Sequence, residues 1–257
     1  MWLRLRQVAL VASSLSRVVD DLNAVFGLEV GFRDPGVARF GLENAVIPVG
    51  SQFLEVVAPT RPGTAGGRLL ERRHGDGGYM VITHCDDHPR RRERVTQLGI
   101  RTVLEFEEQG YRCMQLHPKD TGGSFLEIDW QEGGEDPDGP WAPAGPDWKR
   151  AVRTDVVDGI SAVEVQAVEY ARVASRWSEI VEIALRRGDH DSPEIALDNA
   201  TIRFAPALDG RGDGLAGVEL LAVDADSAMR SARQRDLLDD RGVIMIGGTR
   251  FSLRTGG

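Results

Sequence analysis

Residues 124–130, SFLEIDW, place a glutamate among alternating apolar side chains, and residues 52–59, QFLEVVAP, carry the same pattern. Alternation with a period of two is typical of a β-strand. The glutamates of the two runs, Glu55 and Glu127, lie 72 positions apart, and Gln7 and Met80, in the strand-like runs upstream of them, lie 73 apart. The chain therefore contains an internal repeat of nearly constant spacing, and the fold is predicted from this repeat.

Each copy of the repeat predicts the element order βαβββ. In the first copy a strand-like run at 5–12 precedes a helical pattern at 16–26, and the runs GLEVGF, AVIPVG and QFLEVVAP follow. In the second, YMVITHCDD and the helix PRRRERVTQLG precede IRTVLEF, YRCMQLHP and SFLEIDW. Weaker copies follow residue 150. We predict an α+β fold of four βαβββ modules in two domains, each pair of modules curling mixed sheets around a cavity.

A change of composition marks the boundary between the two pairs. Between Gln131 and Lys149 the chain is rich in Gly, Pro and Asp, which break helical and strand periodicity. We therefore divide the chain into a first domain at 1–132, a linker at 133–149 and a degenerate second domain at 150–257. The linker carries Trp141 and Trp148, so we expect it to be pinned against one of the domains.

Composition and charge exclude several classes of protein. Of the 257 residues, 41% are hydrophobic and the formal net charge is −9, so a nucleic-acid partner, which needs a basic surface, is excluded. No apolar run approaches the roughly 18 residues of a membrane span. We expect a cytoplasmic protein without membrane association. The only cysteines, Cys85 and Cys113, are expected to be reduced and buried.

Four stretches resemble the vicinal oxygen chelate superfamily, which includes glyoxalase I, epimerases, extradiol dioxygenases and bleomycin-resistance proteins. They are QVALVASSLSRVVDDLNAVFGLEV (7–30), QFLEVVAP (52–59), the strand ending in HCDD (84–87) and LHPKDTGGSFLEID (116–129). The resemblance covers residues 1 to about 130 and is weaker beyond them. It implies a glyoxalase-like protein with two tandem domains of this superfamily.

The resemblance also implies a metal site, with one ligand on the first and one on the last strand of each module. The positions carried over are Gln7, Glu55, Met80 and Glu127. A divalent ion there would chelate adjacent substrate oxygens, and Mg, Mn, Zn, Ni or Fe are the candidate cofactors. Met80 stands where the family usually has a histidine, and a thioether is a poor ligand for a hard cation. The residues therefore place the metal in doubt.

The two glutamates are also candidates for the catalytic acid and base, because buried carboxylates are rare unless paired or bound to a cation. The alternative is that Glu55 and Glu127 face solvent on half-buried strands. Gln7 is either a ligand or an inward-facing hydrogen-bonding residue.

Further candidates lie on the closing hairpin of the second module. If Pro118 faces Ser124 across the KDTGG loop, Gln115 and His117 share a face with Phe125, Glu127 and Asp129. His117 would then act as acid or base or replace the missing ligand. Alternatively, it bonds the backbone of its own turn. Gln115 and Phe125 would line the substrate cavity.

His84 lies on the same strand face as Met80, about 13 Å away, and is a cavity-rim candidate or a strand-end surface residue.

The second half retains none of the chelating residues. The four ligand positions fall on Ala162, on Arg203, on Gly217 or Val218, and on Arg250 or Ser252. This half is predicted to be a scaffold, a dimerisation surface or a lid.

Two functions remain open. One is an enzyme, of lyase, isomerase, epimerase or dioxygenase type, that acts on a small oxygenated molecule. The other is a non-catalytic protein that binds and sequesters a small molecule, as bleomycin-resistance proteins do. A homodimer is possible in either case.

Overall fold

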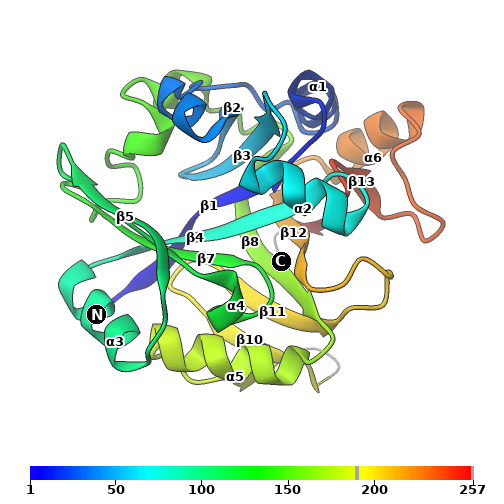
Figure 1. Cartoon of the computed structure of the whole chain (residues 1–257). Helices are drawn as coiled ribbons and strands as arrows, with labels where there is room; N and C mark the ends of the chain where they lie inside the picture. Colours follow the sequence, from blue (N-terminus) through cyan, green and yellow to red (C-terminus); the bar gives the residue numbers. More distant parts are fainter. Residues whose placement is uncertain (189–190, 256–257) are drawn as a thin grey trace.

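The computed structural model describes residues 1–188 and 191–255, and its strands form two seven-stranded mixed sheets (Figure 1). Sheet A has the strand order β2-β3-β1-β4-β7-β6-β5 and sheet B the order β13-β14-β12-β8-β11-β10-β9. The strands of sheet A are β1 (Leu3–Val11), β2 (Leu42–Val49), β3 (Gln52–Pro59), β4 (Gly77–Cys85), β5 (Thr102–Glu108), β6 (Tyr111–Leu116) and β7 (Phe125–Gln131).

The strands of sheet B are β8 (Val157–Ala167), β9 (Arg186–Arg187), β10 (Pro193–Ala196), β11 (Thr201–Pro206), β12 (Gly214–Ala222), β13 (Ile244–Ile246) and β14 (Thr249–Thr255). The α-helices are α1 (Leu15–Phe26), α2 (Ala65–Arg73), α3 (His88–Gln97), α4 (Pro118–Thr121), α5 (Tyr170–Val181) and α6 (Ala225–Gln234). In each sheet the first strands of two modules pair antiparallel at the centre, and each also pairs in parallel with the last strand of its own module. The predicted α+β fold of paired modules is confirmed.

The run GLEVGF (27–32) is not a strand, and this prediction was wrong. Phe32 alone forms a bridge, to Val46 at the edge of β2. Gly27 takes a left-handed conformation that ends α1, and Pro35 begins a 3₁₀-helix, η1 (Pro35–Phe40), so the chain between them runs from one helix into the next and touches β2 only at this bridge. The KDTGG loop contains the short helix α4, and α2 between β3 and β4 had no counterpart in the predicted modules.

The two sheets pack through their convex faces. Val8 and Leu10 on β1 belong to the same buried cluster as Val163 and Val165 on β8. At this junction a Cβ added to Gly78 would lie 2.5 Å from the backbone oxygen of Leu215, so only glycine lets β4 approach β12 this closely. Helix α1 packs beside α6, and α3 beside α5 (Figure 1). Because side chains alternate along a strand, the concave faces of sheets A and B lie on opposite outer sides of this core.

The linker packs on the concave face of sheet A. It contains the 3₁₀-helices η2 (Ala142–Ala144) and η3 (Trp148–Ala151), and Trp141 and Trp148 are both almost fully buried. The ring of Trp148 stands edge-on to Phe53 of β3, with centroids 5.0 Å apart. The expectation that the linker is pinned against a domain is confirmed.

Two further expectations concern the cysteines and membranes. Cys85 and Cys113 are free and buried, as expected. In the parts of the chain that the structure describes, no helix is both long enough and apolar enough to cross a membrane.

Candidate functional site

The strand register of sheet A brings the four candidate ligand positions together on its concave face. Ala9 of β1 pairs with Glu55 of β3 on one side and with Met80 of β4 on the other. Gln7 lies two residues before Ala9 on the same face, and Glu127 of β7 pairs with Ile82, two residues after Met80. All four side chains are buried, so the alternative that the glutamates face solvent is wrong.

Glu55 is a buried carboxylate held by two amides. Nε2 of Gln7 donates to its Oε2 over 2.8 Å, and Nδ2 of Asn44 donates to its Oε1 over 2.7 Å. Burial raises the pKa of Glu55 to about 7, opposed by these two hydrogen bonds and assisted by the negative charge of Glu127. Glu55 therefore exchanges a proton near neutral pH.

The linker fixes the orientation of Gln7. The indole Nε1 of Trp141 donates to Oε1 of Gln7 over 2.8 Å. An indole N–H can only donate, so Gln7 must present its oxygen to Trp141 and its NH₂ group to Glu55. Of the two roles considered for Gln7, metal ligand or inward-facing hydrogen-bonding residue, the structure shows the second. Its amide stabilises the charged form of Glu55.

Glu127 lies in a second polar group of the same face. Nε2 of Gln115 donates to Oε2 of Glu127 over 2.8 Å and lies 3.7 Å from the Sδ atom of Met80. Gln115 pairs with Glu127 across β6 and β7, which confirms the predicted register of this hairpin.

Asp129 is the deepest member of this second group. It accepts hydrogen bonds from the hydroxyl of Tyr111 and from the backbone N–H of Met114. Burial, followed by the charge of Glu127, raises the pKa of Asp129 well above its usual range, which favours the protonated form of this carboxyl group. Ligand atoms of Cys113, Glu127 and Asp129 lie within 4.8 Å of one another.

The four candidate ligands, which we call the quartet, do not fit a divalent metal. Both oxygens of Glu55 are occupied by amide donors, and Gln7 turns its NH₂ group, which cannot ligate, toward the site. The fourth position is the thioether of Met80, which suits soft ions rather than hard ones. The nearby thiol of Cys113 has its pKa raised by burial and by the charges of Glu127 and Asp129, and this opposes the thiolate that a metal would need.

A sequence family model described as a glyoxalase-like domain matches residues 8–181, more than half of the chain. The chain belongs to the glyoxalase-like domain family. The match spans sheet A, the linker, β8 and α5, in agreement with the vicinal oxygen chelate fold seen here. A search of curated proteins found no match.

Solved structures resemble this glyoxalase-like chain in fold. A hypothetical protein from Staphylococcus aureus aligns over 100% of both chains with a TM-score of 0.68 and 12% identity. Methylmalonyl-CoA epimerase from Streptomyces coelicolor covers 50% of this chain and 96% of its own, with 23% identity and a TM-score of 0.45. The epimerase from Mycobacterium tuberculosis covers 50% and 87%, with 20% identity and a TM-score of 0.45.

The two candidate histidines of the glyoxalase-like site, His117 and His84, have no hydrogen bond to Gln7, Glu55, Met80 or Glu127 in the described part of the chain. His117 is the N-cap of α4, where its Nδ1 accepts a hydrogen bond from the backbone N–H of Lys119 over 3.2 Å. This is the alternative in which His117 bonds the backbone of its own turn. His84 is fully buried against Trp2 and Trp141, and neither ring nitrogen has a hydrogen-bond partner among residues 1–188 and 191–255. Burial lowers the pKa of His84 to about 3. His84 therefore lies beneath the linker, neither at a cavity rim nor on the surface.

Phe125 remains near the glyoxalase-like site. It is half-buried beside Met80, with its ring edge-on to Tyr79 at 5.3 Å.

Two residues of the site were not predicted from the sequence, Asn44 and Trp141. Asn44 lies on β2 at a buried position, and its pairing with Val57 places it beside Glu55. A polar residue within the apolar run of β2 was the available signal. The contact of Trp141 with Gln7 joins residues 134 positions apart and follows no local pattern.

Proposed function

We propose that this protein is an enzyme that transfers a proton at a carbon atom next to a carbonyl group of a small molecule, with Glu55 as the base. The observation that carries the proposal is the buried carboxylate of Glu55, whose pKa of about 7 suits a general base at neutral pH. Structural carboxylates that only pair with cations have pKa values below their usual range, and Glu55 has no cation partner in its hydrogen bonds.

The reaction class follows from the groups around Glu55. The carboxylate would take the proton from the C–H bond, and the bonding electrons would move to the carbonyl oxygen to give an enolate. Asp129, whose pKa is raised and which lies beside Glu127, would be the group that returns a proton to the carbon atom or to the oxygen. Return to the opposite face of the same carbon gives an epimerase, and return to a different atom gives an isomerase.

Deuterium exchange tests this proposal. The protein is incubated in D₂O with α-hydroxy ketones, 1,3-dicarbonyl compounds and 2-substituted thioesters, and the loss of the C–H signal is followed by NMR. We expect exchange to be accelerated by the natural protein and to fall by roughly 10²-fold or more in Glu55→Gln. Glu43→Gln, an exposed change on the same sheet one residue from Asn44, is the matched control. Equal rates in Glu55→Gln and the natural protein would contradict the role of Glu55.

A non-catalytic binding protein is the second candidate, and one observation favours it. The polar atoms of Gln7, Glu55 and Glu127 are already engaged with Trp141, Asn44 and Gln115. A site whose polar atoms are already hydrogen-bonded to other protein groups can hold a ligand against its aromatic neighbours without reacting with it. Ligand signals that broaden in the same NMR experiment without deuterium incorporation would favour this function over the enzyme.

A further inference from the structure

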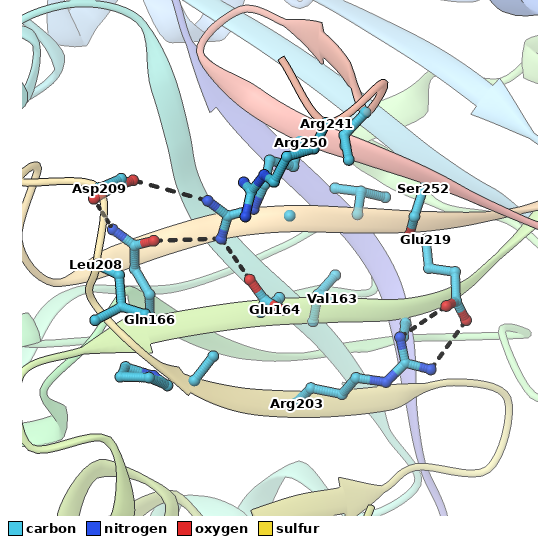
Figure 2. Close-up of a pocket in the computed structure, with 16 residues that line it drawn as sticks. Val163, Glu164, Gln166, Arg203, Leu208, Asp209, Glu219, Arg241, Arg250 and Ser252 are labelled. Atoms are coloured by element: carbon cyan, nitrogen blue, oxygen red, sulfur yellow. Dashed lines mark hydrogen bonds and ion pairs between the residues drawn. The ribbon is translucent and has the colours of Figure 1, made fainter. Parts of the chain in front are cut away.

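The concave face of sheet B contains a cavity of about 620 Å³ (Figure 2). This volume is within the range of small-molecule sites. The cavity belongs to the half whose sequence lost the chelating residues, and it lies on the opposite side of the shared core from Glu55.

The residues of sheet B that are equivalent to the four candidate ligands of sheet A line this cavity. Glu164 pairs with Arg203 and with Gly217, as Ala9 pairs with Glu55 and Met80. The equivalents of Gln7, Glu55, Met80 and Glu127 are therefore Ala162, Arg203, Gly217 and Ser252, and all four line the cavity. This register resolves the two alternatives left open by the sequence in favour of Gly217 and Ser252.

Small side chains make the floor. Ala162 and Gly217 line it from the adjacent central strands β8 and β12, where sheet A has Gln7 and Met80. A Cβ added to Gly217 would meet its nearest neighbour, Cβ of Glu164, at 3.4 Å, which is an ordinary contact. Glycine is thus not required by the backbone or its neighbours here, and its effect is to leave space above the sheet. Val243 and Leu208 add apolar surface to the walls.

The arginines of the cavity differ in how fully they are bonded. Arg203 is engaged by both oxygens of Glu219, at 2.8 and 3.1 Å, and lies 3.3 Å from Glu194. Arg250 uses only Nη2, toward Glu164 and Gln166, while its Nη1 is 3.9 Å from Asp209. Within the described part of the chain, Nε and Nη1 of Arg250 donate no hydrogen bond.

Arg241 supplies a second cation on the same side. Its side chain is 75% exposed, and its Nε and Nη2 each donate a hydrogen bond of 3.4 Å to Asp239. Figure 2 shows Arg241 and Arg250 along one wall of the cavity and Arg203 at the opposite wall. Arg250 is also ion-paired with Glu164 and Asp209, which line the same cavity. Among the described residues, Nε of Arg250 and Nη1 of Arg241 have no hydrogen-bond acceptor, so these N–H groups can bind an anion.

We propose that this cavity is a second binding site, for a small organic carboxylate with a flat apolar body. The carboxylate lies against Arg250 and Arg241, whose planar N–H groups match its two oxygens. The apolar body lies over Ala162 and Gly217. The site is independent of the function proposed for Glu55, because the two lie on opposite faces of the molecule.

Calorimetric titration with 2-naphthoate, and with 2-naphthamide as its neutral analogue, tests the proposal. We expect the natural protein to bind naphthoate roughly tenfold or more tightly than naphthamide. Arg250→Gln should remove that difference. Gly217→Leu, which fills the floor and leaves every charge in place, should abolish binding of both compounds.

Two controls separate this site from the rest of the molecule. Arg172→Gln removes an exposed arginine of α5 that pairs with Glu169 outside the cavity, and Glu55→Gln alters the site in sheet A. Both should bind naphthoate as the natural protein does. Absence of naphthoate binding, equal binding of the two compounds, or undiminished binding in a folded Gly217→Leu protein would overturn the proposal. If Arg250→Gln fails to fold, the Gly217→Leu result alone decides.

Discussion

The indole of Trp141 donates a hydrogen bond of 2.8 Å to Gln7, and this contact determines which end of the Gln7 amide faces Glu55. Trp141→Phe removes the donor and leaves the buried oxygen of Gln7 without it. We expect the free energy of unfolding to fall by roughly 1–3 kcal/mol beyond the effect of the smaller ring. Urea denaturation measures this loss.

Trp148→Phe is the matched control for that prediction. Trp148 is buried in the same linker and packs on Phe53, but it makes no hydrogen bond through its indole to the described residues. Its substitution therefore reports the loss of ring area alone. Equal losses in the two variants would show that the bond to Gln7 contributes nothing to stability.

The raised pKa of Glu55 links stability to pH. Because folding raises this pKa from 4.5 to about 7, the folded state binds the proton more tightly than the unfolded state. The contribution of Glu55 is most favourable below pH 4.5, is lost as the pH rises toward 7 and stays low above it. The full loss corresponds to about 3 kcal/mol.

Comparison with Glu55→Gln isolates this contribution. The difference in unfolding free energy between the natural protein and the variant should shift against the natural protein between about pH 5 and about pH 8. Any constant cost of placing an amide beside Gln7 and Asn44 cancels from that shift. A difference that is independent of pH would place the pKa of Glu55 near its ordinary value.

The same pKa predicts the pH dependence of proton transfer. If Glu55 is the base, the rate of deuterium exchange at low substrate concentration should rise with pH, reach half its maximum near pH 7 and then level off. Asn44→Ala removes one donor to the carboxylate, which should raise the pKa further and move the midpoint to higher pH. A midpoint unchanged by Asn44→Ala would argue against Glu55 as the titrating group.

The hydrogen bonds of the quartet predict weak binding of divalent ions. Thermal unfolding with Mg²⁺, Mn²⁺, Zn²⁺, Ni²⁺ or Fe²⁺ should give the same midpoint as unfolding with a chelator, because Gln7 and Glu55 are held by other partners. Stabilisation that is present in the natural protein and absent in Glu127→Ala would contradict this expectation and restore the metal site.

Both thiols should be unreactive in the folded protein. Burial raises the pKa of Cys85 to about 12 and also raises that of Cys113, and the thiolate is the reactive form. Dithionitrobenzoate at about pH 8 should therefore modify neither cysteine until a denaturant is added, after which both should react. Rapid reaction of one thiol without unfolding would show that its side chain is accessible.

The local sequence pattern was sufficient to predict the fold and part of the site. Alternation along QFLEVVAP and SFLEIDW places Glu55 and Glu127 on one strand face, and the constant spacing of the repeat places both strands beside their partners. The pairing of Gln115 with Glu127 followed from the length of the loop between them. These features depend on periodicity and chain length, both of which can be read locally.

The rest of the site depends on contacts that periodicity does not determine. The orientation of Gln7 is set by Trp141, which arrives from the linker, and His117 is removed from the site by a short helix in a loop expected to be a turn. The cavity over Gly217 was not predicted either. The absence of chelating residues in the second half predicted that this half has no binding site. In the structure, the small side chains at those positions leave space for a cavity.

The convex faces of the two sheets form one core, with Val8 and Leu10 packed in the same cluster as Val163 and Val165. Each half therefore shields the apolar face of the other from water, and removal of either half would expose the core of its neighbour. A substitution on the outer face of sheet B, such as one in the cavity over Gly217, therefore leaves this shared core and the site around Glu55 in place.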